Sequence, residues 1–222
     1  GFVDEWHHTR MGEYTYACSD FKFKKGLVSA TKTSGHTLQI ADGLWLDKKF
    51  KAAMMKSIAQ SELDRKRFVY SDIGFILLQQ VVEAVTGKTL DAYLVSEFYR
   101  PMGLEHTLFQ PLNRYKKADI MPTAANDYLR RQDLCGYVHD EAAAFMGGVS
   151  GNAGLFSTAQ ELGKIYQMIL NEGELDGKRY LRPETCRIFT TEKSAVSHRG
   201  LGYDKPNLKD PKANACASSA PA

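Results

Sequence analysis

One apolar stripe constrains the fold more than any other feature of this sequence. Ser71 and Asp72 are residue types that favour the N-terminal cap of a helix. Gly87, further along, stands where a glycine commonly ends one. Between them apolar residues recur at intervals of three and four, at Ile73, Ile76, Leu77, Val81, Ala84 and Val85. The pattern predicts a helix that follows Asp72 and buries one face.

Other segments carry weaker helical patterns. We expect helices near 48–60, over 90–99, from Ser157 or Thr158 to about 172, and near 183–190. Thr158 and Glu161 have the spacing of a capping box. The helix that they begin has an apolar stripe made of Leu162, Ile165, Tyr166, Ile169 and Leu170.

The remaining segments lack a sustained period. Residues 1–37 suggest irregular structure with a short strand, and residues 38–46 suggest an extended or 3₁₀ segment. Residues 101–156 suggest a long turn-rich stretch. The expected class is α+β, rich in helix. Residues 1–205 are expected to form a single partial domain, and 206–222, rich in Pro, Ala and Ser, a loop or disordered tail.

Composition excludes several classes of protein. Hydrophobic residues make up 43% of the 222 residues, which is typical of a globular protein and not of a disordered one. No apolar run approaches the ~20 residues of a membrane-spanning helix. The 29 basic and 26 acidic residues are mixed along the chain, so no nucleic-acid partner is expected. The four cysteines form no C-x-x-C pair and are expected to be free thiols.

Local chemistry offers two candidate sites. Tyr70 directly precedes the helix that follows Asp72, where the helix dipole and unpaired N–H groups favour an anion, so its phenol could act as an acid or base. The competing interpretation is an aromatic ring that packs on the first helical turn. His139 and Asp140 could serve a metal-dependent hydrolase, but consecutive ligands cannot all face one ion, and a structural His in a loop is the simpler interpretation. We expect neither a metal nor a cofactor.

Three ordered blocks carry a family resemblance. They are YSDIGF at 70–75 with the helix after it, FYRPMGLEHT at 98–107, and GGVSGNAGLFSTA at 147–159. Together they resemble the serine β-lactamase superfamily, which includes class C β-lactamases, DD-peptidases and β-lactamase-like esterases. The match looks closest to a bacterial branch in which the domain often accompanies a family 3 glycoside hydrolase domain. The resemblance implies the helical lobe and part of the cleft of the β-lactamase/transpeptidase-like fold, with most of its antiparallel sheet missing.

The resemblance also assigns roles to residues. Tyr70 takes the family's proton-shuttle position, and Asp72 takes the position of its Asn. Gly151 and Asn152 would contact substrate. Relatives tend to have His where this chain has Asn152. An ionised Asp72 accepts hydrogen bonds but cannot donate one as an amide does. The chain therefore departs from penicillin-type recognition, which permits an esterase or another substrate class.

The family's other two motifs are not evident. Ser29 and Lys32 spell Ser-x-x-Lys, but the polar residues that follow them suit a loop better than a buried helix. No Lys-Thr-Gly or His-Thr-Gly follows residue 201. We therefore expect an internal fragment, inactive alone, of a serine hydrolase that forms an acyl-enzyme on a peptidoglycan-type amide, ester or lactam. The alternative is a non-catalytic module that binds cell wall or a partner domain. The resemblance suggests the cell envelope, or periplasm.

Overall fold

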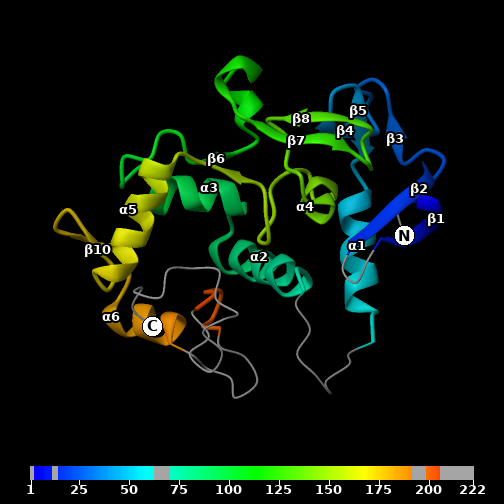
Figure 1. Cartoon of the computed structure of the whole chain (residues 1–222). Helices are drawn as coiled ribbons and strands as arrows, with labels where there is room; N and C mark the ends of the chain where they lie inside the picture. Colours follow the sequence, from blue (N-terminus) through cyan, green and yellow to red (C-terminus); the bar gives the residue numbers. More distant parts are fainter. Residues whose placement is uncertain (1–2, 12–14, 63–70, 192–198, 206–222) are drawn as a thin grey trace. The chain divides into compact units, whose positions relative to one another are not determined.

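The structure is a computed structural model of the chain that describes residues 3–11, 15–62, 71–191 and 199–205 (Figure 1). Tyr70 lies outside the described residues, as does the tail from 206 onward, so the predictions made for them stay predictions. Of residues 3–22 only the backbone is described.

The N-terminal part forms strands rather than the irregular structure expected from its sequence. Strand β1 (Val3–Met11) pairs antiparallel with β2 (Thr15–Phe23). A three-stranded antiparallel sheet follows, with β5 (Leu44–Asp47) between β3 (Val28–Ser29) and β4 (His36–Ala41). The expectation of a single extended segment over 38–46 missed the turn at Asp42 and Gly43, a residue pair typical of a tight hairpin.

The helices predicted before residue 100 are confirmed. Helix α1 spans Phe50–Ala59 and α2 spans Ile73–Thr86. Gly87 ends α2 with a left-handed φ of 67°, a conformation that glycine adopts without strain. Helix α3 (Leu90–Leu94) continues as the π-helical segment η1 (Val95–Tyr99).

The stretch predicted to be turn-rich contains short paired strands. Strand β6 (Leu108–Phe109) pairs with β9 (Leu155–Phe156), and β7 (Pro122–Asp127) pairs with β8 (Gln132–Cys135), both antiparallel. The same stretch holds two 3₁₀ turns and one short helix, which are η2 (Pro111–Asn113), η3 (Lys117–Asp119) and α4 (Glu141–Phe145).

Residues 23–62, 71–100 and 105–157 belong to one compact unit with its own core. Phe145 of α4 is 1% exposed, and its ring centroid lies 5.1 Å from that of Phe50 and 6.4 Å from that of Phe23. The β7–β8 hairpin lies beside the β4–β5 turn (Figure 1), where the Gln132 side chain accepts from the Asp42 N–H at 3.0 Å. The buried members of the core are Leu27, Ile40, Leu46, Leu129, Val138, Ala143, Ala144 and Phe145.

Residues 101–104, 158–191 and 199–205 belong to the second compact unit. It contains α5 (Ala159–Leu170), α6 (Pro183–Thr190) and a small hairpin of β10 (Glu174–Leu175) with β11 (Lys178–Arg179). Thr158 caps α5 by accepting the Glu161 N–H at 3.2 Å, which confirms the predicted cap. No helix among the described residues is long and apolar enough to cross a bilayer.

The predicted burial of the α2 stripe is wrong. On α2 only Ile76 of the stripe is buried, at 1% exposure, whereas Val81 is 55% and Val85 81% exposed. On α5 Tyr166 is 59% and Leu170 73% exposed. Apolar periodicity gave the correct helix but not its surroundings, because burial depends on what packs against the helix in space.

Candidate active site

The start of α2 presents a carboxylate that does not cap the helix. Asp72 occupies the N-cap position, yet its side chain accepts no capping hydrogen bond, and Ser71 Oγ accepts the Ile73 N–H at 3.3 Å instead. Asp72 lines a cavity of about 540 Å³. Its carboxylate is therefore available for a ligand or a substrate group.

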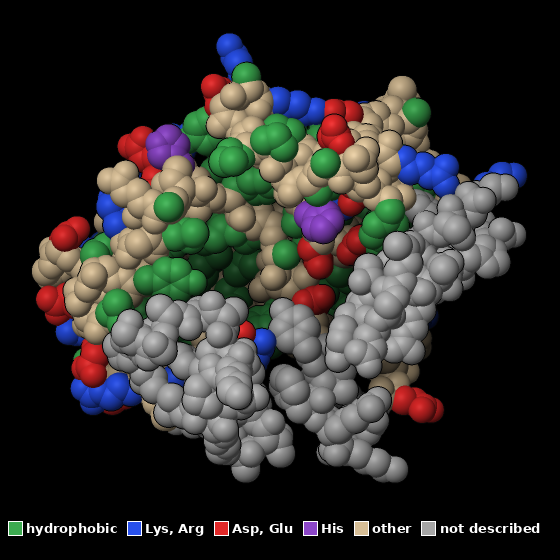
Figure 2. All heavy atoms as spheres, viewed as in Figure 1, with side chains coloured by type: hydrophobic (Ala, Val, Ile, Leu, Met, Phe, Trp, Pro, Cys, Tyr) green, Lys and Arg blue, Asp and Glu red, His purple; other side chains and the backbone are tan. Residues whose placement is uncertain are grey.

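Two further acidic residues face the same cavity. Asp140 and Glu141, at the start of α4, line it together with Asp72. Burial, and then the negative charges of Asp140 and Glu141, raise the pKa of the Asp72 carboxyl above its ordinary value. Acidic side chains gather near the middle of the face shown in Figure 2, over α2 and α4. This end of the cavity therefore favours groups that donate hydrogen bonds or carry positive charge.

The other walls of this cavity are largely apolar. Phe50, Ala53 and Met54 of α1 line it, and Phe145 contributes from α4. Tyr128, which is 41% exposed, adds an aromatic side chain. An apolar cavity with a few convergent polar groups is the usual form of a small-molecule site.

Asn152 is fixed by hydrogen bonds to neighbouring side chains. Its Nδ2 donates to Asp140 Oδ1 at 3.0 Å, and its Oδ1 accepts from Ser150 Oγ at 2.6 Å. Asp140 Oδ1 also accepts the Ala143 N–H at 2.7 Å and so caps α4. Asn152 therefore orients the loop against the start of α4. Whether it contacts substrate, as the resemblance implies, stays a prediction.

Gly151 packs against the backbone of α2. A Cβ at this position would collide with the carbonyl group of Phe75, so only glycine fits. Gln79, which is 2% exposed, accepts the Gly151 N–H at 3.2 Å and donates to the Val149 carbonyl at 3.3 Å. This buried amide holds the 149–151 loop on α2.

A buried ion pair that no sequence pattern predicts holds the segment before α4. The Asp127 and Arg130 side chains are both 0% exposed, with Arg130 Nη2 2.7 Å from Asp127 Oδ2. Arg130 also donates to the carbonyl groups of Val138 at 3.0 Å and His139 at 2.5 Å. Burial alone would raise the pKa of Asp127, but the hydrogen bonds and charge of Arg130 outweigh it and lower that pKa. The pair therefore fixes the segment that delivers Asp140.

The Ser-x-x-Lys pair lies on a strand end and the loop after it, not on a helix. Ser29 ends strand β3, and its Oγ accepts the Thr31 N–H at 3.3 Å. Lys32 Nζ lies over the ring of Trp45, 5.4 Å from its centroid. Ser29 thus lacks the helical setting that the resembled family gives its nucleophile.

His139 and Asp140 do not converge on one point. His139 is largely exposed and its Nε2 lies 3.9 Å from Asp127 Oδ2, whereas Asp140 is occupied by the α4 cap and Asn152. Within the described part of the chain, no group of three or more His, Cys, Asp or Glu side chains could hold a metal ion. Cys135 and Cys186 are free thiols, in line with the expectation for the cysteines.

Comparison with known proteins decides the family. A family described as "Beta-lactamase" matches residues 30–206. The chain belongs to this family. It is 34% identical over 216 residues to a "Putative D-alanyl-D-alanine carboxypeptidase" of Escherichia coli K12, which covers 91% of the chain and 50% of the relative.

Two further comparisons refine this placement. The chain is 36% identical over 155 residues to an "N-acetylmuramyl-L-alanine amidase" of Bacillus subtilis, covering 64% of the chain and 35% of that relative. The structure of the octameric penicillin-binding protein homologue from Pyrococcus abyssi matches with a TM-score of 0.51 and 18% identity, over 71% of this chain and 35% of that one. This confirms the α+β fold class and the partial β-lactamase-like fold. The chain spans about half the length of the E. coli relative, or less in the other two.

Proposed function

We propose that this chain forms one wall of the active site of a serine hydrolase that resembles the D-alanyl-D-alanine carboxypeptidases. The substrate is a peptidoglycan-derived amide, ester or lactam. The observation that carries the proposal is the uncapped Asp72 carboxylate at the start of α2, facing a cavity of about 540 Å³ in a member of the beta-lactamase family.

The reaction proceeds in two steps of acyl transfer. A serine oxygen attacks the substrate carbonyl carbon, the bond to the leaving group breaks, and the leaving group takes up the serine proton. Water then cleaves the resulting ester and releases the acid. Tyr70, two residues before Asp72, relays the proton between serine and leaving group. Asp72 accepts a hydrogen bond from a substrate N–H.

The acidic lining narrows the substrate class. Three carboxyl groups line the cavity, and charges of the same sign near a substrate carboxylate oppose its binding. A substrate that presents an N–H or a protonated amine toward Asp72, with an apolar part against Phe50 and Met54, fits this lining. Its carboxylate, where it has one, points away from α2.

The nucleophile of this proposal is not Ser29. Ser29 lies at the end of a strand, and Lys32 lies over Trp45 instead of beside a serine on a helix. The exposed apolar side chains of α2 also support a nucleophile from outside this chain, because an exposed apolar surface marks a site where more polypeptide packs. The serine and the remaining walls are then supplied by polypeptide outside these 222 residues.

Acylation with a fluorescent penicillin and with a fluorophosphonate tests this proposal. We expect no covalent adduct on the 222-residue chain alone. In the longer protein that contains the chain, we expect one adduct on a serine other than Ser29, located by peptide mass mapping. Tyr70→Phe should slow acylation there by about 100-fold or more, the range of general acid–base catalysis.

Ser29→Ala is the matched control and should leave labelling unchanged. An adduct on Ser29 that this variant abolishes would contradict the assignment of the nucleophile. No adduct on any serine, together with retention on peptidoglycan sacculi, would instead support the alternative of a non-catalytic cell-wall module.

A further inference from the structure

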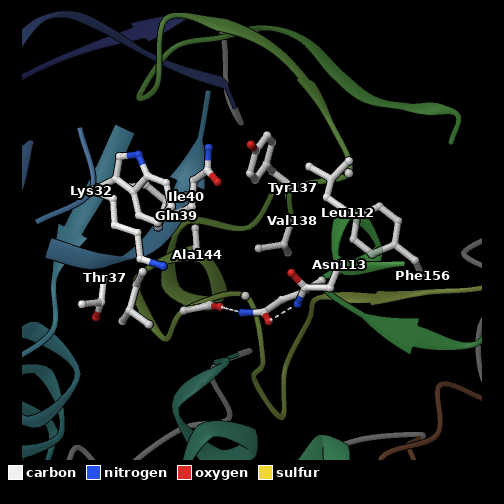
Figure 3. A pocket seen from close by; sticks show the side chains of 16 residues that line it. Lys32, Thr37, Gln39, Ile40, Leu112, Asn113, Tyr137, Val138, Ala144 and Phe156 are labelled. Carbon is white, nitrogen blue, oxygen red and sulfur yellow. Dashed lines mark hydrogen bonds between the residues drawn. The ribbon is translucent and has the colours of Figure 1, made fainter. Parts of the chain in front are cut away.

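A second cavity lies in the same compact unit as the Asp72 cavity, and it has no acidic residue in its lining. It encloses about 320 Å³ between β4, the β3–β4 loop, η2 and the segment 136–148. Figure 3 shows Lys32 and Thr37 on one side of the space and Leu112 and Asn113 on the other. Its volume lies at the lower end of the range for small-molecule sites.

One charge dominates this cavity. Of the residues that line it, Lys32 alone carries a formal charge at neutral pH. None of the ion pairs in the described part of the chain includes Lys32, and its Nζ lies 5.4 Å from the centroid of the Trp45 ring. The indole face holds the ammonium group beside the cavity without neutralising it. Lys32 is itself exposed to solvent, and an anion that enters the cavity meets its positive charge with no acidic side chain in the lining.

The polar groups opposite Lys32 are held in place before any ligand binds. Gln110 donates to the Gly147 carbonyl at 2.5 Å and accepts from Asn113 Nδ2 at 3.1 Å, as the dashed lines in Figure 3 show. The Asn113 amide oxygen remains available to accept a hydrogen bond. Pre-organised groups of this kind lower the entropic cost of binding.

Apolar side chains fill the rest of the lining. Leu38, Leu112, Val138 and Phe156 contribute aliphatic and aromatic surface, and Trp45 borders the same space. The lining therefore has three parts, which are the Lys32 ammonium, the Asn113 amide oxygen and the apolar walls. A ligand that matches them has a carboxylate for Lys32, an N–H for Asn113 and an apolar group for the walls.

We propose that this cavity binds small organic monoanions in which a carboxylate is joined to an apolar group and an amide, as in an N-acylated amino acid. The site differs in charge from the Asp72 cavity, since its charged residue is a lysine and the other cavity presents three carboxyl groups. The two cavities also use different residues of α4, Ala144 here and Glu141, Ala142 and Phe145 there. Binding at this site needs no turnover, so its test is independent of the proposed hydrolase.

Tryptophan fluorescence provides the test. The chain contains two tryptophans, so Trp6→Phe leaves Trp45 as the reporter beside Lys32. We expect N-acetyl-leucine to change this fluorescence saturably. Its C-terminal amide, which has nearly the same shape and no charge, should bind about tenfold more weakly, as expected for the loss of a charge-assisted hydrogen bond.

Variants at Lys32 connect the preference to this residue. In Lys32→Gln the dissociation constants of the acid and the amide should differ by no more than about twofold. Lys32→Arg should keep the preference for the acid. Lys25→Gln removes an exposed lysine that does not line the cavity and should change nothing. The proposal is overturned by an acid that gives no saturable signal, by an amide that binds equally well, or by an acid preference that survives in Lys32→Gln.

Discussion

Two helices of the same unit, α2 and α4, differ in how their position is fixed. Helix α2 has 14 residues and a long apolar stripe, yet most of that stripe is exposed. Helix α4 has only five residues, but Asp140 caps it, Arg130 holds the segment before it, and Phe145 is buried in the core. The helix with the clearer sequence pattern is thus the one left largely exposed, and a short helix is fixed by contacts from residues distant in the sequence.

The largest effect is expected at the buried ion pair behind α4. Asp127→Ala leaves Arg130 buried without its partner, which typically costs about 3–5 kcal/mol of unfolding free energy. Urea denaturation followed by circular dichroism measures this loss. The matched control is Glu97→Ala at the exposed pair with Lys88, where a change within about 1 kcal/mol is expected. Equal losses in the two variants would show that burial does not distinguish them.

A smaller effect is expected where α2 meets the 149–152 loop. Gly151→Ala places a methyl group against the Phe75 carbonyl and should destabilise the protein by about 1–3 kcal/mol. Gly74→Ala, on the same helix, has open space around the added Cβ and should be stabilising by about 0.5–1 kcal/mol. Thermal unfolding separates the two, and a destabilised Gly74→Ala beside an unchanged Gly151→Ala would refute the contact.

The carboxyl group of Asp72 gives a pH-dependent prediction. Because its pKa is raised on folding, ionised Asp72 disfavours the folded state, and this penalty grows as pH rises through the unfolded and then the folded pKa. Asp72→Asn should therefore stabilise the protein at pH 7, by less than about 1 kcal/mol, and have little effect at pH 3. Unfolding measured across this pH range checks the sign.

High salt serves as the control for Asp72. At 1 M NaCl the repulsion from Asp140 and Glu141 is screened, and the stabilisation by Asp72→Asn should shrink. A stabilisation that is larger at pH 3 than at pH 7 would contradict the raised pKa.

The smallest effect is expected on the exposed face of α2. Val85 is 81% exposed, so Val85→Lys should change the unfolding free energy of the isolated chain by no more than about 0.5 kcal/mol. Leu46→Ala, at a residue that is 0% exposed, should cost about 2–5 kcal/mol. A large loss in Val85→Lys would mean that the 222 residues already cover this face.

The longer helices could be predicted from sequence because their signals are local, whereas the five-residue α4 was not predicted. The cap at Thr158, the left-handed Gly87 and the spacing of apolar residues each act within a few positions of the chain. The β1–β2 hairpin could not be found in this way, because its aromatic residues show no regular alternation and strand pairing is a non-local property. The sequence named only part of the candidate site, and the role that it gives Asp72 stays a prediction. Asp72 followed from the family resemblance, whereas the Asp127–Arg130 pair gave no signal that composition or spacing could reveal.

The sequence by itself determined the approximate positions of the longer helices, the Thr158 cap, the Gly87 helix end and the membership of the beta-lactamase family, since each depends on residues close together in the chain or on an ordered set of motifs. Only the tertiary structure decided which apolar faces are buried, that Asp72 faces two other carboxylates, and that Lys32 lies over Trp45 beside a cavity. Burial, charge interactions and cavities arise between residues far apart in sequence, and their energies depend on distances that the order of residues does not specify.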